Sequence, residues 1–306
     1  AWKEGGRQMA APAISHYWSW GAVPEKFYGN VMAEFRDNGV NRLILTHFLL
    51  PRFAEEPEFR KSVLSLCSRF GMRFDGAHAP WGNAWDLNET DSDARKLMLR
   101  NQKRMIEAAG EAGAGSIVIH IGDSICKRAD APPVPVLRDL AVAALEELLP
   151  AAEKAGVTVA IENIIAPTDT IGELLAIFER IDSPYLGCCY DSGHENVMTA
   201  TPGKRPDMLC EYIRDTLWHG KPQLQERILE RLTPHIVCCH LHDNDGLNDA
   251  HTLPGLGTID WAEKIPLLRQ SPRLMSVQNE MNCVGHEISV RRMVETCDAL
   301  WRGEHL

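Results

Sequence analysis

The chain contains eight short apolar runs, and a long helical pattern follows each of them. The runs cover residues 13–18, 41–47, 72–78, 116–120, 157–162, 185–191, 236–239 and 274–280. The helical patterns cover residues 24–38, 55–70, 92–112, 134–155 and 171–180, a segment ending at 232, and residues 261–269 and 288–301. Helices between apolar strands imply right-handed crossovers and a parallel sheet. Eight such units in 306 residues predict a closed (β/α)8 TIM barrel.

No linker or change of composition divides the chain, so we expect a single α/β domain that spans residues 1–306. The longest interruption is a polar insertion at residues 199–221. An open doubly wound sheet is the alternative architecture. It has little support in its dinucleotide-binding form, because no GxGxxG motif opens the first helix.

Charge and cysteine usage narrow the range of partners and compartments. The formal net charge is -10, and no run of Lys or Arg could neutralise successive phosphates, so nucleic acid is not expected as a partner. The nine cysteines lack CxxC spacing, and four of them form adjacent pairs inside apolar runs, which is typical of buried reduced thiols and of a cytoplasmic protein. No apolar run approaches the ~18 residues of a membrane span, and no apolar region of a signal peptide precedes Ala11, although removal of a leader stays open.

Every predicted strand ends in a side chain that can bind a metal or move a proton. These side chains are His16, His47, His78, His120, Glu162, Asp191, His240 with His242, and Glu280. Each one alone could be an ordinary polar residue facing a loop, and for His16 and His47 that interpretation is at least as good. Because active sites of TIM barrels lie at the carboxyl ends of the strands, the set as a whole predicts a functional site.

Three of the strand ends are carboxylates that directly follow apolar runs. Burying Glu162, Asp191 and Glu280 together is costly unless a cation neutralises them. With His240 they form a mixed oxygen and nitrogen ligand set that suits Mn, Mg, Co or Zn. Alternation along a strand puts His242 on the same side as His240, so either imidazole could supply this ligand.

Four motifs carry a resemblance to a known family. They are AIEN at residues 160–163, YDSGH at 190–194, HLHDND at 240–245 followed by DAHTLPGLGTIDW at 249–261, and NE at 279–280. Together they resemble the xylose isomerase-like TIM-barrel superfamily, which contains sugar and sugar-phosphate isomerases, ketose 3-epimerases and endonuclease IV. The resemblance covers nearly the whole chain. It implies a metal site made of Glu162, Asp191, His240 and Glu280.

The resemblance also implies roles for five further residues. Endonuclease IV uses additional ligands for a cluster of zinc ions, and their counterparts here are His78, His120, His194, Asp249 and His251. In the sugar enzymes of the superfamily, these positions recur as polar groups that bind substrate. We therefore expect His78, His120, His194, Asp249 and His251 to bind the substrate, and we expect the same of His242.

These features lead to one expected function and two alternatives. The expected function is a cytosolic, divalent-metal-dependent isomerase or epimerase of a carbohydrate, either a sugar or a sugar phosphate, in which Glu162 and Glu280 move a proton through an enediolate. The first alternative is a metal-dependent hydrolase or lyase, and the second is a barrel without activity that serves as a subunit of a complex. Self-association into a homo-oligomer stays open. Trp81 and Trp85 are candidates either for stacking on a sugar ring or for loop packing.

Overall fold

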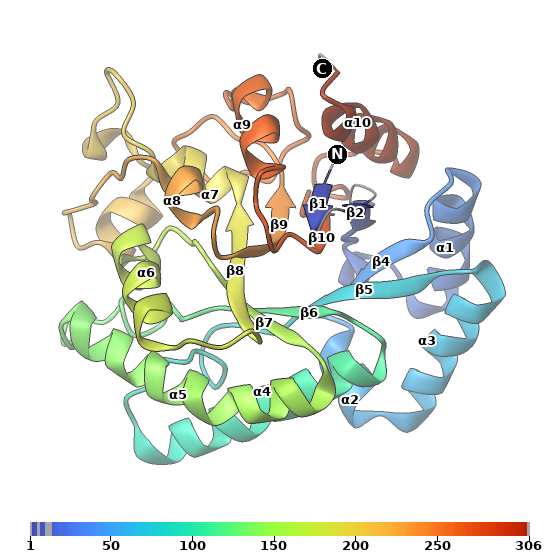
Figure 1. Cartoon of the computed structure of the whole chain (residues 1–306), viewed down its shortest axis with the longest axis horizontal. Coiled ribbons are helices and arrows are strands. Elements are labelled where there is room, and N and C mark those ends of the chain that lie inside the picture. Colours follow the sequence, from blue (N-terminus) through green and yellow to red (C-terminus); the bar gives the residue numbers. More distant parts are fainter. Residues whose placement is uncertain (1, 5–6, 10–13, 305–306) are drawn as a thin grey trace.

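A computed structural model describes residues 2–4, 7–9 and 14–304 and contains a closed barrel of eight parallel strands (Figure 1). The strands follow one another around the barrel in chain order, and β10 closes it by pairing with both β3 and β9. Their bounds are β3 (Ile14–His16), β4 (Arg42–Leu45), β5 (Arg73–His78), β6 (Ser116–Ile119), β7 (Thr158–Glu162), β8 (Leu186–Asp191), β9 (Ile236–Leu241) and β10 (Ser276–Asn279). The predicted (β/α)8 barrel is confirmed. Residue 13, at the start of the first predicted strand, lies outside the described residues.

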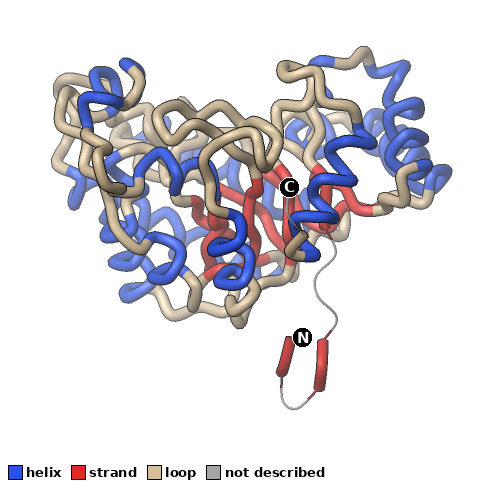
Figure 2. Tube along the Cα trace, turned by 90° about the horizontal axis from the view of Figure 1, so that it is seen from above, coloured by secondary structure: helices blue, strands red, loops and turns tan. Residues whose placement is uncertain are grey.

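Helices separate the strands along the chain and cover the outside of the barrel (Figure 2). They are α1 (Tyr28–Asp37), α2 (Leu50–Glu55), α3 (Pro57–Phe70), α4 (Ser92–Glu111), α5 (Val134–Ala155), α6 (Ile171–Arg180), α7 (Ser192–Met198), α8 (Ile228–Leu232), α9 (Trp261–Leu268) and α10 (Val290–Arg302). Two short strands outside the barrel sheet, β1 (Trp2–Glu4) and β2 (Arg7–Met9), pair antiparallel. None of the helices in the described part of the chain combines the length and the apolar character needed to cross a bilayer.

Two helices were not anticipated by the apolar pattern. The helix α2 precedes α3, and Glu56 between them is extended because a residue before proline avoids helical backbone angles. The helix α7 begins directly after β8, where the Asp191 side chain accepts a hydrogen bond of 2.7 Å from the His194 backbone N–H. The end of β8 and the start of α7 are therefore tied together at Asp191.

The adjacent cysteine pairs are explained by the alternation of side chains along a strand. Cys189 and Cys238 pack with Val118, Ala160 and Val237 in a small cluster of their own, whereas Cys188 and Cys239 belong to the main core. All nine cysteines are free thiols, and most of them are buried. Within this tight barrel, a Cβ on Gly187 would lie 2.5 Å from Val237 Cγ1, so this position must be glycine.

The structure places His16 in the hydrophobic core. Its ring lies 5.8 Å from that of Phe35, its Nδ1 has no hydrogen-bond partner among the described residues, and burial lowers its pKa to about 4. The folded protein thus resists a proton that the unfolded chain accepts near pH 6.5. Above pH 6.5 the neutral His16 ring does not lower the free energy of unfolding. As the pH falls below 6.5 the free energy of unfolding decreases, and this decrease levels off below about pH 4.

Replacing His16 by Leu should therefore make the free energy of unfolding depend less on pH below neutrality. Between pH 7 and pH 4.5 we expect the wild type to lose about 2 kcal/mol more unfolding free energy than the His16→Leu variant. Urea unfolding at both pH values measures the difference. The exposed His286 offers a control through His286→Leu, and an equal acid loss in wild type and in both variants would contradict the assignment.

Candidate active site

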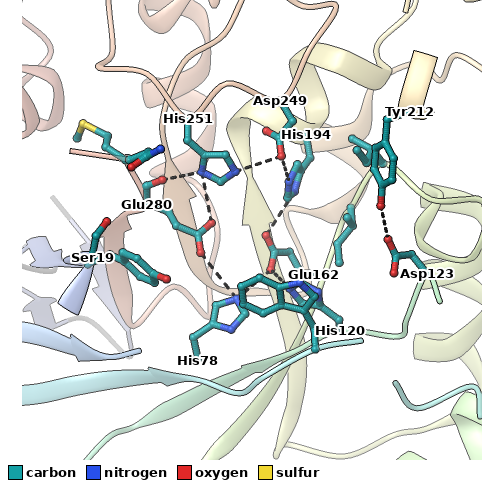
Figure 3. A pocket seen from close by; sticks show the side chains of 16 residues that line it. Ser19, His78, His120, Asp123, Glu162, His194, Tyr212, Asp249, His251 and Glu280 are labelled. Atoms are coloured by element: carbon teal, nitrogen blue, oxygen red, sulfur yellow. Dashed lines mark hydrogen bonds and ion pairs between the residues drawn. The ribbon is translucent and has the colours of Figure 1, made fainter. Parts of the chain in front are cut away.

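The ten predicted site residues all lie at the carboxyl ends of the barrel strands or in the loops and the helix that follow them. They are His78 at the end of β5, His120 after β6, Glu162 at the end of β7, Asp191 at the end of β8, His194 in α7, His240 and His242 at the end of β9, Asp249 and His251 in the following loop, and Glu280 after β10. Figure 3 labels His78, His120, Glu162, His194, Asp249, His251 and Glu280 among them. Their ligand atoms fall into overlapping groups that lie close enough to share a metal ion, and three of these groups together include all ten residues. Two further groups combine the same residues differently, one of them with Cys189.

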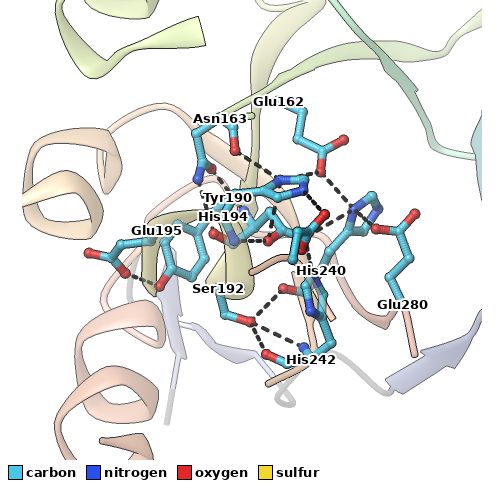
Figure 4. A network of polar contacts seen from close by, with 12 residues as sticks. Glu162, Asn163, Tyr190, Ser192, His194, Glu195, His240, His242 and Glu280 are labelled. Carbon is cyan, nitrogen blue, oxygen red and sulfur yellow. Dashed lines mark hydrogen bonds and ion pairs between the residues drawn. The ribbon is translucent and has the colours of Figure 1, made fainter. Parts of the chain in front are cut away.

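The first group surrounds the Nδ1 atom of His240 (Figure 4). This nitrogen lies 3.2 Å from Glu162 Oε1, 3.1 Å from Glu280 Oε2 and 3.8 Å from Asp191 Oδ2. One candidate ligand atom from each of the four residues lies within 4.8 Å of the others. Three buried carboxylates around one imidazole carry a surplus of negative charge, which a divalent cation would neutralise.

The second group is centred on Asp249. Its Oδ2 atom lies 3.2 Å from His194 Nε2 and 3.1 Å from His251 Nε2. The fourth member is His242, whose Nε2 contacts Asp191 Oδ2 at 2.9 Å. Since Asp191 also belongs to the first group, it links the two groups.

The third group adds two histidines on the other side of Glu162. Glu162 Oε2 lies 3.6 Å from His78 Nε2 and 3.2 Å from His120 Nε2. Glu162 Oε1 faces His240, so the two oxygens of one carboxylate belong to different groups. A bridging carboxylate of this kind suits a site with more than one cation.

The position of the proton on three histidine rings favours a bound cation. The Nδ1 atoms of His78, His194 and His251 lie 2.7, 3.1 and 2.7 Å from the backbone oxygens of residues 79, 163 and 280. A carbonyl oxygen only accepts, so Nδ1 carries the proton and each neutral ring presents the Nε2 lone pair to a carboxylate. This arrangement is repulsive unless a second proton or a metal ion lies between the two groups. The residues present therefore fit a metal centre.

The electrostatics of the metal-free protein agree with this conclusion. Burial alone would lower the pKa of His240, but the carboxylates of Glu280 and Glu162 outweigh it and raise that pKa well above its usual value. Burial is also outweighed at His251, where mainly Asp249 raises the pKa to about 9. In turn, His240 and its neighbouring histidines hold the pKa of Glu162 low despite its burial. Without a cation, protons on the imidazoles balance the carboxylates.

Two residues that the analysis of the sequence did not single out hold the first group in place (Figure 4). The Asn163 side chain donates to the Asp191 backbone oxygen at 3.0 Å and accepts from its N–H at 2.8 Å. The Ser192 hydroxyl donates to the backbone oxygens of His240 and His242 at the end of β9, which lie 3.1 and 2.8 Å away. The Asn of AIEN and the Ser of YDSGH therefore position ligands and do not face the pocket.

Asp243 organises the long loop that carries Asp249 and His251. Its side chain accepts hydrogen bonds of 2.9 Å from the Gly255 N–H and from Trp261 Nε1, and a third from the Ile259 N–H. A Cβ on Gly257 would lie 2.1 Å from Asp243 Oδ1, so the second glycine of PGLG serves close approach as well as the turn. His251 itself has a positive φ of 49°, which is rare for a residue other than glycine and is held by this loop.

Members of all three groups line a pocket of about 330 Å³ (Figure 3), namely His78, His120, Glu162, His194, Asp249, His251 and Glu280. Asp191, His240 and His242 are buried and are not among its lining residues. Trp81 lines the pocket, with its ring stacked 5.1 Å from that of His120 and 44% of the residue exposed. Trp85 does not line this pocket and packs against the core. His47 lies at the edge of the site, where its Nδ1 contacts the Tyr17 hydroxyl at 2.7 Å, and His16 lies outside it.

The chain belongs to the xylose isomerase-like TIM barrel family, which residues 35–282 match. It is similar to an uncharacterized protein of Methanocaldococcus jannaschii, with 26% identity over 231 residues that cover 74% of this chain and 68% of the relative. The predicted family is confirmed.

Two solved structures illustrate the fold. One is a D-tagatose 3-epimerase-like protein, with 22% identity, a TM-score of 0.64, and coverage of 86% of this chain and 88% of that one. The other is the IOLI protein with a binding zinc atom, with 15% identity, a TM-score of 0.68, and coverage of 94% and 96%. At these identities the likeness shows a shared fold, and the chemistry of this chain has to be argued from its own residues.

Proposed function

We propose that this protein is a divalent-metal-dependent isomerase or epimerase of a sugar or a closely related polyhydroxy carbonyl compound. The observation that carries the proposal is the approach of Glu162 and Glu280 to the same His240 nitrogen, at 3.2 and 3.1 Å. Both carboxylates also line the pocket, so a ligand lying there contacts two candidate proton acceptors. The D-tagatose 3-epimerase-like structure and the zinc-bound structure support a sugar substrate and a metal.

The cation would be held by Glu162, Asp191, His240 and Glu280. When bound, Mn, Zn, Co or Mg supplies a Lewis acid that stabilises negative charge on adjacent substrate oxygens. Glu162 ends β7 and Glu280 directly follows β10. These strands are separated by β8 and β9 in the barrel, so the two carboxylates would reach the substrate from two directions. One carboxylate removes the proton from carbon, and a carboxylate on either face of the planar enediolate returns it.

The histidines of the other groups would bind substrate oxygens. His78, His120, His194 and His251 line the pocket together with Asp249, whereas His242 is fully buried against Asp191. For His242 the geometry supports a ligand or positioning role better than direct contact with substrate. Trp81 offers an exposed aromatic face to a sugar ring at the side of the pocket.

Proton transfer is tested by incubating the metal-loaded protein with candidate ketoses in D2O. We expect deuterium at C1 for aldose–ketose isomerisation, or at C3 for epimerisation, and NMR reads the position. The metal-free protein is the control and should give no label. Bound metal with no turnover of any sugar in a broad panel would contradict the proposal and favour the other functions.

A hydrolase or lyase is the second candidate, and the Asp249 group favours it. His194, His242, Asp249 and His251 could hold a further cation beside the first, and multinuclear sites suit hydrolysis of phosphate esters. The net charge of -10 argues against a duplex substrate. Zinc-dependent cleavage of an abasic duplex, together with metal analysis showing two or three ions per chain, would place this candidate first.

The compartment is also part of the proposal. All nine cysteines are free thiols, which supports action in the reducing cytoplasm.

A barrel that only serves as a subunit of a complex is the remaining alternative. Turnover of any sugar in the same panel would separate an enzyme from such a subunit.

A further inference from the structure

One side of the pocket is built where two loops meet through Tyr212 and Asp123. Tyr212 begins the π-helix η5 (Tyr212–Leu217) inside the polar insertion, and Asp123 follows β6. The Tyr212 hydroxyl donates to Asp123 Oδ2 at 3.0 Å. In the view of Figure 3, this pair lies on the far side of Glu162 from Glu280. A substrate that contacts the first metal group and lies along this side of the pocket would reach Asp123.

The Asp123 carboxylate has one oxygen available for a ligand. Lys127 Nζ lies 3.0 Å from Oδ2, the same oxygen that accepts from Tyr212. Among the described residues, no hydrogen bond or ion pair involves Oδ1. Asp123 lines the pocket with 21% of its side chain exposed, so Oδ1 can accept a hydrogen bond from a substrate hydroxyl.

Apart from its histidines, the pocket offers no cationic side chain to a phosphate. Among its described lining residues there is no Lys or Arg, while four carboxylates line it. Lys127 is already neutralised by Asp123 at 3.0 Å, and in the insertion Lys204 donates to backbone oxygens at 2.7 and 2.6 Å and Arg205 pairs with Asp207 at 3.0 Å. A phosphate at the Asp123 end would therefore lose hydration beside an ion pair that carries no net positive charge.

The position of Tyr212 is fixed by the rest of the insertion. Trp218 Nε1 donates to the Ile165 backbone oxygen at 2.8 Å, and His219 Nε2 bonds the Cys126 oxygen at 2.8 Å. These contacts join the insertion to the loops after β7 and β6, and they hold Tyr212 against Asp123 before any substrate arrives.

We infer that the pocket selects an unphosphorylated, uncharged polyhydroxy substrate, and that Asp123 is the residue that accepts its distal hydroxyl and rejects a terminal phosphate. This inference rests on the proposed function, because it takes the metal group as the end that holds the reacting carbons. It narrows the substrate class from sugars and sugar phosphates to free sugars.

Binding of matched pairs to the Mn²⁺-loaded protein tests the inference. The probes are D-fructose with D-fructose 6-phosphate and D-xylulose with D-xylulose 5-phosphate, measured by calorimetry. In the wild type we expect each ester to bind at least about tenfold more weakly than its parent ketose, which corresponds to about 1.4 kcal/mol. Asp123→Asn should shrink this ratio to near one, because it removes the charge and keeps the shape.

Two further variants separate charge from other effects. Tyr212→Phe removes the hydroxyl but leaves the carboxylate, so it should keep the ratio. Asp130→Asn, in the same loop but paired with Arg128 on the surface, is the matched control and should also keep it. An ester that binds the wild type as tightly as its parent, or a ratio that Asp123→Asn leaves unchanged, overturns the inference.

The outcome is distinct from that of the proposed function. If the ketoses bind with the expected ratio but no deuterium enters them in D2O, the proton-transfer proposal fails and the selectivity of the pocket stands. If label enters a ketose and its ester equally well, the proposed function stands and the role of Asp123 fails.

Discussion

Replacing Glu162 or Glu280 by Gln is expected to lower turnover about a hundredfold or more, in line with the contribution of a general base. Gln keeps the size of the side chain but cannot take up a proton from carbon. Both glutamates line the pocket and face the same His240 nitrogen. Steady-state kinetics with the labelled product measure the loss.

Metal content must be measured on the same samples, because each glutamate is also a proposed ligand. Reloading with excess Mn²⁺ separates lost binding from lost proton transfer. Glu173→Gln is a suitable control, since Glu173 lies on the outer helix α6 and contacts Arg138 at 3.2 Å. Full turnover by either active-site variant would rule out the proposed acid–base pair.

Asp191→Asn is expected to weaken metal binding at least about tenfold. Asp191 is fully buried, and its carboxylate is one of three in the first metal group. Asn can still accept the hydrogen bond from the His194 backbone, so the start of α7 should persist while one negative charge is lost. Elemental analysis after dialysis against a chelator reports the occupancy.

Asp169 provides a matched control for this substitution. It is a buried aspartate after β7, and it does not belong to any of the metal groups found among the described residues. Burial raises the pKa of Asp169 well above its usual value, and Asp169→Asn replaces a buried carboxyl that lies outside the metal groups. Equal metal content in Asp191→Asn and Asp169→Asn would count against Asp191 as a ligand.

The barrel could be predicted because its signal is local and repeated. The bounds predicted for α5 and α6 agree with the structure, since each follows a proline or threonine and continues as an amphipathic pattern. The helix α2 was missed because it contains a proline, is short, and precedes α3 without a polar turn. A short helix of this kind owes its stability to packing, as Leu50 and Phe53 are fully buried.

The site was predictable to the extent that strand ends meet at one face of a barrel. That rule located His78, Glu162 and Asp191 without any knowledge of distances. It could not reveal Asn163, whose bonds to Asp191 span 28 residues, or Tyr212, whose bond to Asp123 spans 89. Such contacts depend on how loops cross over the barrel, and loop paths leave no periodic pattern in a sequence.

The hydrogen bonds from imidazole Nδ1 atoms to backbone carbonyls have a thermodynamic consequence. They leave only Nε2 to hold the extra proton on His194 and His251, and a metal ion needs those same atoms. Loading the site near neutral pH must then release protons into the buffer, so the heat of binding will depend on the ionisation enthalpy of that buffer. Because the pKa of His251 is about 9, the affinity for the metal ion should rise with pH up to about that value. Below it, each proton that binding releases should lower this affinity about tenfold per pH unit. An acidic medium would therefore empty the centre.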